Sequence, residues 1–157
     1  MATPLPLPPG TVPARVRVAL VQYGQRRVAG FDDFAAQVEE GVRVAADYGS
    51  DFVLFPELFT LQLLSAEPRM LSPAEAIERL SEHTPAFTAL LRRLATQYHV
   101  HVIGGTHPTR TEEGVLRNPC FIATRDGVLH RRDKLHITPS EQGSWAARRL
   151  ARRCGSG

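Results

Sequence analysis

Two short apolar runs with an amphipathic segment between them constrain the fold of this chain more than any other feature. Residues 15–23, RVRVALVQY, alternate and then become continuously apolar, which predicts a strand buried toward its second half. Residues 51–55, DFVLF, form a second short apolar run. Between them, apolar side chains recur at helical spacing over residues 31–46, and Gly49 supplies a helix stop. This strand–helix–strand order predicts an α/β domain with a largely parallel, covered sheet.

The remaining segments extend the same pattern. Residues 72–98 show helical periodicity in two pieces, each of which begins with a hydroxyl residue followed by proline. Residues 100–107, VHVIGGTH, predict a strand that ends in a glycine pair. Residues 118–136 predict a hairpin whose turn is Asp126-Gly127. The predicted order is therefore β-α-β-α-α-β-β-β.

The composition is that of an ordinary globular domain. The 157 residues are 43% hydrophobic and 22% charged, and no apolar run is long enough to span a bilayer. The proline-rich residues 1–14 lack the apolar core of a secretion signal and are predicted to form a disordered lead-in. Two cysteines do not make a disulfide framework, so a reduced, cytoplasmic setting is predicted.

The net charge of +3 is unevenly distributed along the chain. Residues 143–157 hold four arginines, at positions 148, 149, 152 and 153. Without these four, 15 basic residues face 16 acidic ones, so the body of the chain is not predicted to bind nucleic acid. A basic tail can contact RNA or acidic lipid, but a solvated end is the interpretation that we favour.

Three charged residues are candidates for chemistry. Glu57 follows the apolar run of residues 51–55, at the carboxyl edge where α/β proteins place their sites, and apolar surroundings make a carboxylate a better proton acceptor. Lys134 follows the hairpin and could stabilise an oxyanion, and Glu141, seven residues later, could hold its ammonium group. The alternatives are a solvated loop glutamate for Glu57 and a basic surface loop for Lys134.

The histidines and the glycine pair do not predict a metal or nucleotide site. His99 and His101 share a predicted strand and His107 follows, but no carboxylate cluster accompanies them. Gly104 and Gly105 lack the spacing and the lysine of a phosphate-binding loop, and a tight backbone approach is enough to explain them.

Neither cysteine is a convincing nucleophile. Cys120 lies in a predicted strand among apolar residues and is interpreted as a small core residue. Cys154 has arginine neighbours, which favour a thiolate, but it lies near the end of a tail that is predicted to be mobile. Mobility is incompatible with the fixed geometry that catalysis needs.

Four stretches together resemble the nitrilase, or carbon–nitrogen hydrolase, superfamily. VRVALVQY is similar to the first strand of the family, DFVLFPELF to its catalytic-glutamate motif, and VHVIGGTH to the strand between. RNPCFIATRDGVLHRRDKLHITPSE resembles the hairpin that runs into the catalytic-lysine motif. The resemblance covers about residues 15–142, and the order and spacing of the four stretches make it specific.

The resemblance implies a fold and a mechanism. The family fold is an α-β-β-α sandwich, and family members commonly dimerise. Glu57 corresponds to the general base, Lys134 to the oxyanion stabiliser and Glu141 to a glutamate that supports the lysine. A cysteine thiolate attacks an amide or nitrile carbon, and water hydrolyses the resulting acyl-enzyme. No metal or organic cofactor is implied.

The chain departs from the family pattern at the nucleophile. The family cysteine lies further downstream, after another strand, whereas Cys154 comes too early and is followed by Gly-Ser-Gly. We therefore predict the N-terminal half of the family domain over residues 15–142, followed by a non-family, arginine-rich tail over 143–157 that an early stop or frameshift would explain.

Three functions are compatible with these features. The first is a carbon–nitrogen hydrolase whose full-length form acts on a small amide or nitrile. The second is an inactive fragment or pseudoenzyme that binds a partner through an uncovered sheet face. The third, a nucleotide-binding domain, lacks a phosphate loop. Half of a sandwich is expected to expose a sheet face and an edge, so self-association is predicted, and no turnover is expected from the chain alone.

Overall fold

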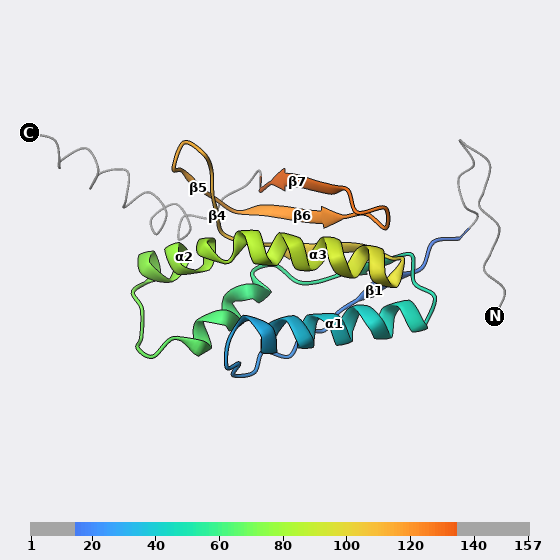
Figure 1. The fold of residues 1–157 in the computed structure, drawn as a ribbon, viewed down its shortest axis with the longest axis horizontal. Coiled ribbons are helices and arrows are strands. Elements are labelled where there is room, and N and C mark those ends of the chain that lie inside the picture. The colour runs from blue at the N-terminus through green and yellow to red at the C-terminus, as the bar shows by residue number, and fades with distance from the viewer. Residues whose placement is uncertain (1–14, 135–157) are drawn as a thin grey trace, which may run out of the picture.

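The computed structural model describes residues 15–134, which form a five-stranded sheet with helices along one face (Figure 1). The predicted lead-in, Glu141, Cys154 and the arginine-rich tail lie outside the described residues. The elements, in chain order, are β1 (Val18–Leu20), α1 (Phe31–Asp47), β2 (Phe52–Leu54), the 3-10 helix η1 (Phe59–Ala66), α2 (Pro73–Glu82), α3 (Thr84–Tyr98), β3 (His101–Thr106), β4 (Thr109–Arg110), β5 (Leu116–Arg117), β6 (Pro119–Ala123) and β7 (Leu129–Asp133).

The sheet is mixed, with the strand order β1-β2-β3-β6-β7. The first three strands are parallel, as the sequence predicts, whereas β6 runs antiparallel to β3, and β7 runs antiparallel to β6. Because two reversals restore the direction, β7 runs the same way as β2 and β3. The carboxyl ends of β2, β3 and β7 therefore lie at one edge of the sheet.

Local signals account for the helix boundaries. Ser72 and Glu75 form a complete capping box at the start of α2, with Pro73 in the first turn. Gly49 follows α1 with a φ of 67° and donates its backbone N–H to the carbonyl of Ala46. None of the helices between residues 15 and 134 has both the length and the apolar character that a bilayer crossing requires.

The core lies between the sheet and the adjacent helices α1 and α3, which run next to each other in Figure 1. Val53, Val102 and Phe121 point from neighbouring strands toward these helices and are almost fully buried. The buried helix residues that meet them are Phe34, Val38, Val42, Phe87, Leu91 and Leu94. Alternation along the strands thus assigns one sheet face to the core.

The other sheet face is uncovered, which departs from the covered sheet predicted by the strand–helix–strand order but is what half of a sandwich is expected to expose. Leu20 is 74% exposed and Val18 is 50% exposed, so the prediction that the first strand is buried toward its second half is wrong. Leu54, Ile103 and Ile122, on the same face by alternation, are only partly buried. Nothing within residues 15–134 covers this face, which is apolar on β1 and β2 and carries His130 and Arg132 on β7. We refer to it as the open face.

Candidate functional site

Glu57 is held at the sheet edge by the segment that follows β2. The N–H of Phe55 donates to the carbonyl of Ile103 at 2.9 Å, and the N–H of Leu58 donates to the carbonyl of Thr106 at 3.2 Å. Pro56 has no N–H to satisfy, and Leu58 adopts a left-handed φ of 53° that starts the turn into η1. Both ends of the segment are therefore bonded to β3, with Glu57 between them.

Lys134 reaches Glu57 across two strands, because β3 and β6 lie between β2 and β7 in the sheet. It follows β7 directly, and its N–H donates to the carbonyl of Asn118 at 3.3 Å, which continues the β6–β7 pairing. The Lys134 Nζ lies 2.6 Å from the Glu57 Oε1, although 77 residues separate them in sequence. The two side chains are 23% and 52% exposed, respectively, so the ion pair is accessible from solvent. The structure therefore brings two of the three candidate residues, Glu57 and Lys134, into contact.

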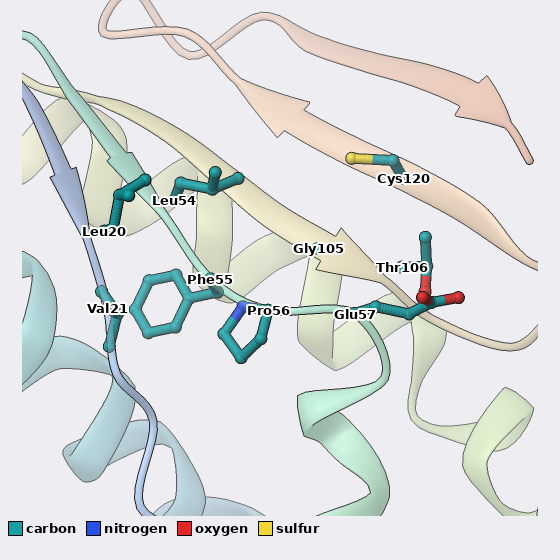
Figure 2. Close-up of a pocket in the computed structure, with 9 residues that line it drawn as sticks. All are labelled: Leu20, Val21, Leu54, Phe55, Pro56, Glu57, Gly105, Thr106 and Cys120. Atoms are coloured by element: carbon teal, nitrogen blue, oxygen red, sulfur yellow. The ribbon is translucent and has the colours of Figure 1, made fainter.

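A mostly apolar hollow of about 440 Å³ lies beside Glu57 on the open face (Figure 2). Its lining residues are Leu20, Val21, Leu54, Phe55, Pro56, Glu57, Gly105, Thr106 and Cys120. Glu57 is the charged member of this set. The hollow can therefore take a small, largely apolar group next to a carboxylate.

Thr106 is a candidate site residue that the sequence analysis did not identify. It lines the hollow together with Glu57, and its Oγ1 is buried without a hydrogen-bond partner among the described residues. Buried hydroxyl groups are almost always hydrogen-bonded, so such an exception requires an explanation. Only the strand pairing, in which Thr106 lies opposite Cys120, could have indicated that this hydroxyl belongs to the site.

Cys120 is not the core residue that the sequence predicts. It is partly buried and lines the hollow, because it occupies a position of β6 that faces the open side. Burial raises the pKa of its thiol, which keeps it protonated at neutral pH and makes it a poor nucleophile. In the view of Figure 2 its sulfur points away from the Glu57 carboxylate.

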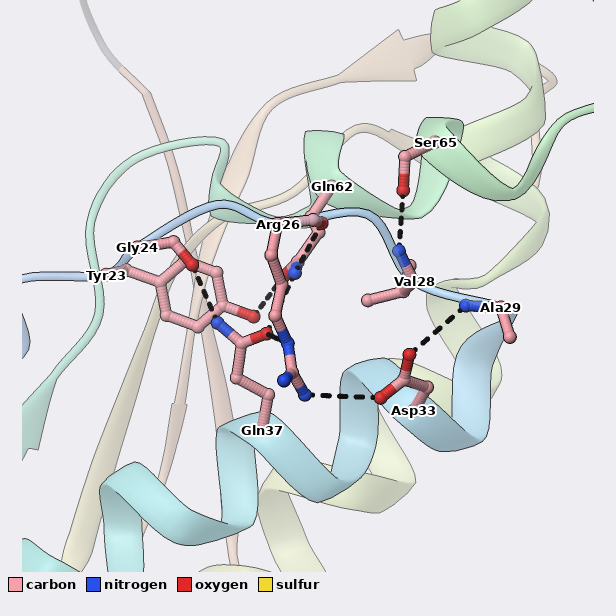
Figure 3. Close-up of polar contacts among 9 residues, drawn as sticks. All are labelled: Tyr23, Gly24, Arg26, Val28, Ala29, Asp33, Gln37, Gln62 and Ser65. Atoms are coloured by element: carbon pink, nitrogen blue, oxygen red, sulfur yellow. Dashed lines mark hydrogen bonds and ion pairs between the residues drawn. The ribbon is translucent and has the colours of Figure 1, made fainter.

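A network of hydrogen bonds, which no sequence motif indicates, ties the loop after β1 to η1 and α1 (Figure 3). The Tyr23 hydroxyl donates to Gln62, whose amide donates to the carbonyl of Arg26 and to Gln37, both at 2.9 Å. Gln37 in turn donates to the carbonyl of Gly24 at 2.8 Å. Burial raises the pKa of Tyr23 to about 12, so its hydroxyl remains a donor at neutral pH. These bonds fix η1, the helix that begins two residues after Glu57.

The histidines that the structure describes do not form a metal site. Among residues 15–134, no group of three or more histidine, cysteine, aspartate and glutamate side chains is arranged to hold a metal ion. His99 does not share a strand with His101, contrary to the prediction, because it ends α3 in a left-handed conformation. His107 is fully buried between the hydroxyl groups of Thr60 and Thr84, at 2.9 and 3.1 Å from its ring nitrogens.

The buried His107 predicts a loss of stability in acid. Burial, with a smaller contribution from His83, lowers the pKa of His107 from 6.5 to about 3. As the pH falls, His107 is therefore protonated in the unfolded chain at a higher pH than in the folded chain. The stabilisation present above pH 6.5 is lost as the pH falls toward 3. We expect His107 to contribute a slope of about 1.4 kcal/mol per pH unit between pH 6 and pH 4. Urea melts across this range measure the slope.

Matched variants identify the contribution of this histidine. In His107→Gln the slope of the unfolding free energy against pH is expected to flatten, even though the variant is less stable overall. His130 is exposed, so His130→Gln is expected to keep the slope. Equal slopes in all three proteins would contradict a buried neutral His107.

Comparison with known proteins extends these observations. The carbon-nitrogen hydrolase family model matches residues 17–152. The chain is 44% identical over 131 residues to "Probable hydrolase YhcX" of Bacillus subtilis, a match that covers 83% of this chain and 25% of YhcX. The match to the family model extends ten residues beyond the predicted domain end at 142.

Solved structures share the fold. A carbon-nitrogen hydrolase from Helicobacter pylori matches with a TM-score of 0.64 and 14% identity, over 83% of this chain and 43% of that one. An amidase from Nesterenkonia sp. AN1, in a mutant form showing Michael addition of acrylamide at the active site cysteine, matches with a TM-score of 0.65 and 18% identity, over 83% of this chain and 49% of that one. The chain thus spans less than half the length of these two structures.

Proposed function

Because this chain belongs to the carbon–nitrogen hydrolase family, we propose that it carries the glutamate–lysine part of a site that hydrolyses a small amide or nitrile. The observation that carries the proposal is the 2.6 Å contact between Lys134 Nζ and Glu57 Oε1 beside a mostly apolar hollow. An amidase or nitrilase site of this family requires a base and an oxyanion-stabilising cation near each other. The apolar lining suits the acyl part of a small substrate.

Glu57 acts as the proton carrier in the proposed mechanism. Its carboxylate takes the proton from a cysteine thiol, and the thiolate forms a bond to the carbonyl carbon of the amide. Lys134 stabilises the resulting oxyanion, and Glu141 is proposed to support the lysine. The C–N bond then breaks as Glu57 returns the proton to the leaving amine. Glu57 then deprotonates water, whose oxygen bonds to the thioester carbon. The C–S bond breaks and Glu57 returns the proton to the cysteine sulfur, which gives the carboxylic acid and the free thiol.

The nucleophile is proposed to come from outside residues 15–134. Cys120 has a raised pKa and is not assigned this role. Cys154 lies outside the described residues, and its sequence context does not match the family motif. The chain alone is therefore expected to be inactive.

A chimera tests the proposed function. The segment of YhcX that matches this chain is replaced by the corresponding residues of this chain up to Lys134, and ammonia release from a panel of small amides and nitriles is measured. We expect the chimera to hydrolyse the panel members that YhcX hydrolyses, and the chain alone to release no ammonia above background. A folded chimera that is inactive on those substrates would contradict the proposal. If the chain alone releases ammonia and Glu57→Gln abolishes this release, the expectation that the chain is inactive by itself is wrong.

The open face supports a second candidate function, a binding module that associates through an apolar sheet surface. Its exposed residues include Val18 and Leu20 on the edge strand β1. We expect the chain to self-associate in a concentration-dependent way, and Leu20→Arg to weaken this association at least tenfold, because burying an unpaired charge is costly. Sedimentation velocity over a concentration series measures the effect.

Met70 provides the control for this experiment. It is apolar and 95% exposed but lies in the loop before α2, so Met70→Arg is expected to leave the association unchanged. A monodisperse monomer that unfolds cooperatively would contradict the self-association.

A further inference from the structure

The backbone just before Glu57 lies against Gly105 of β3 more closely than any side chain would permit. A Cβ atom on Gly105 would lie 2.1 Å from the carbonyl oxygen of Pro56 and 2.9 Å from its carbonyl carbon. Non-bonded atoms are in contact at about 3.5 Å, so the two backbones would have to separate by roughly 1.4 Å. Gly105 also has a φ of 60°, which disfavours other residues.

The displaced atoms belong to the peptide that precedes Glu57. The hydrogen bonds from Phe55 to Ile103 and from Leu58 to Thr106 hold this segment on either side of the contact. Because both ends are held, the segment cannot simply slide away from β3. A side chain on Gly105 would therefore push out the part of the segment that carries Glu57.

The neighbouring Gly104 faces a different environment. A Cβ atom there would lie 2.4 Å from Leu91 Cδ1 and 3.2 Å from Phe87 Cζ, which are side-chain atoms of α3. Gly104 therefore accommodates the helix layer, whereas Gly105 accommodates the Glu57 segment. The two glycines of VHVIGGTH provide a matched pair for experiment.

The same glycines interrupt the pairing of β3 with β6. Ile103 pairs with Ile122 and Thr106 pairs with Cys120, so three steps along β3 correspond to two along β6. The extra residue is a β-bulge, a feature that redirects side chains near functional sites. Here it places Thr106 on the same side as Cys120, where both line the hollow beside Glu57.

We propose that Gly105 is a positioning residue for Glu57: its missing side chain sets where the Glu57 carboxylate stands relative to Lys134. The importance of this position for catalysis rests on the proposed function. The effect of Gly105 on the position of Glu57 does not. The proposal predicts that a methyl group at residue 105 disturbs the Glu57–Lys134 contact, and that one at residue 104 does not.

The test follows the Glu57 carboxyl signal by NMR in the full chain labelled with ¹³C at glutamate carboxyl groups. The signal is assigned by its disappearance in Glu57→Gln, and its shift on Lys134→Met reports the contact. We expect this shift to persist with Gly104→Ala and to fall by at least half with Gly105→Ala. Gly105→Asn is expected to match Gly105→Ala, because asparagine tolerates a positive φ but still carries a Cβ.

Three outcomes would overturn the proposal. The first is an undiminished Lys134→Met shift in folded Gly105→Ala and Gly105→Asn proteins. The second is an equal loss of the shift in Gly104→Ala. The third is unfolding of both Gly105 variants while Gly104→Ala folds, which would make Gly105 a determinant of the fold. Because the readout is a contact rather than turnover, an inactive YhcX chimera would leave this result unaffected.

Discussion

Glu57→Gln in the YhcX chimera is expected to lower kcat/KM for a small amide by about 10²–10⁴-fold, the usual contribution of a general acid–base residue. Glutamine has the same shape and can still accept a hydrogen bond from Lys134 through its carbonyl oxygen. It cannot take up a proton from a thiol or from water. The substitution therefore removes the proton transfer and retains most of the geometry.

Glu112→Gln is the matched control, because it makes the same chemical change at an exposed position between β4 and β5. We expect this variant to keep the rate of the chimera. Circular dichroism and urea melts of both variants establish that they fold. A folded Glu57→Gln chimera with an unchanged rate would rule out Glu57 as the base.

Phe59→Ala is expected to lower the free energy of unfolding of the chain by about 3–5 kcal/mol, as is typical of a buried phenylalanine. Phe59 is 1% exposed and begins η1. Its ring centroid lies 4.9 Å from that of Phe55, 5.6 Å from that of Phe34 and 5.8 Å from that of Phe87. The substitution removes apolar burial and leaves a cavity among rigid rings that cannot collapse to fill it.

Urea melts at neutral pH measure this loss, and Tyr48→Ala is the control. Tyr48 is 73% exposed, so removing its ring is expected to change the free energy of unfolding by less than about 0.5 kcal/mol. A loss below about 1 kcal/mol in Phe59→Ala would contradict the central role of this ring. Because Phe59 lies two residues after Glu57, the same ring also anchors the site to the core.

Features with short-range causes were predictable. The capping box of Ser72 and Glu75 and the Asp126-Gly127 turn depend on neighbours within a few residues. The apolar face of α1 follows from helical periodicity. The β2 strand, with Glu57 directly beyond Phe55 and Pro56, could likewise be located from its apolar run.

Other features depend on what packs against a residue and were not predictable. An uncovered sheet face was expected from the half-sandwich, but only the packing shows that Leu20 lies on it, because its sequence context is that of a buried strand. Cys120 and Thr106 line the hollow because of the pairing register and the bulge in β3. Glu141 lies outside the described residues, so its support of Lys134 stays a prediction, as does the cytoplasmic location.

The site illustrates the same division. The run DFVLFPELF alone places a carboxylate after a buried strand, because apolar runs and proline act through local sterics and burial. No local rule could connect Glu57 with Lys134, which lies 77 residues away. Folding brings them to 2.6 Å because β2 and β7 run in the same direction, so the residues after both strands reach the same edge of the sheet. The carboxylate is a property of the chain, whereas the ion pair arises from the strand order.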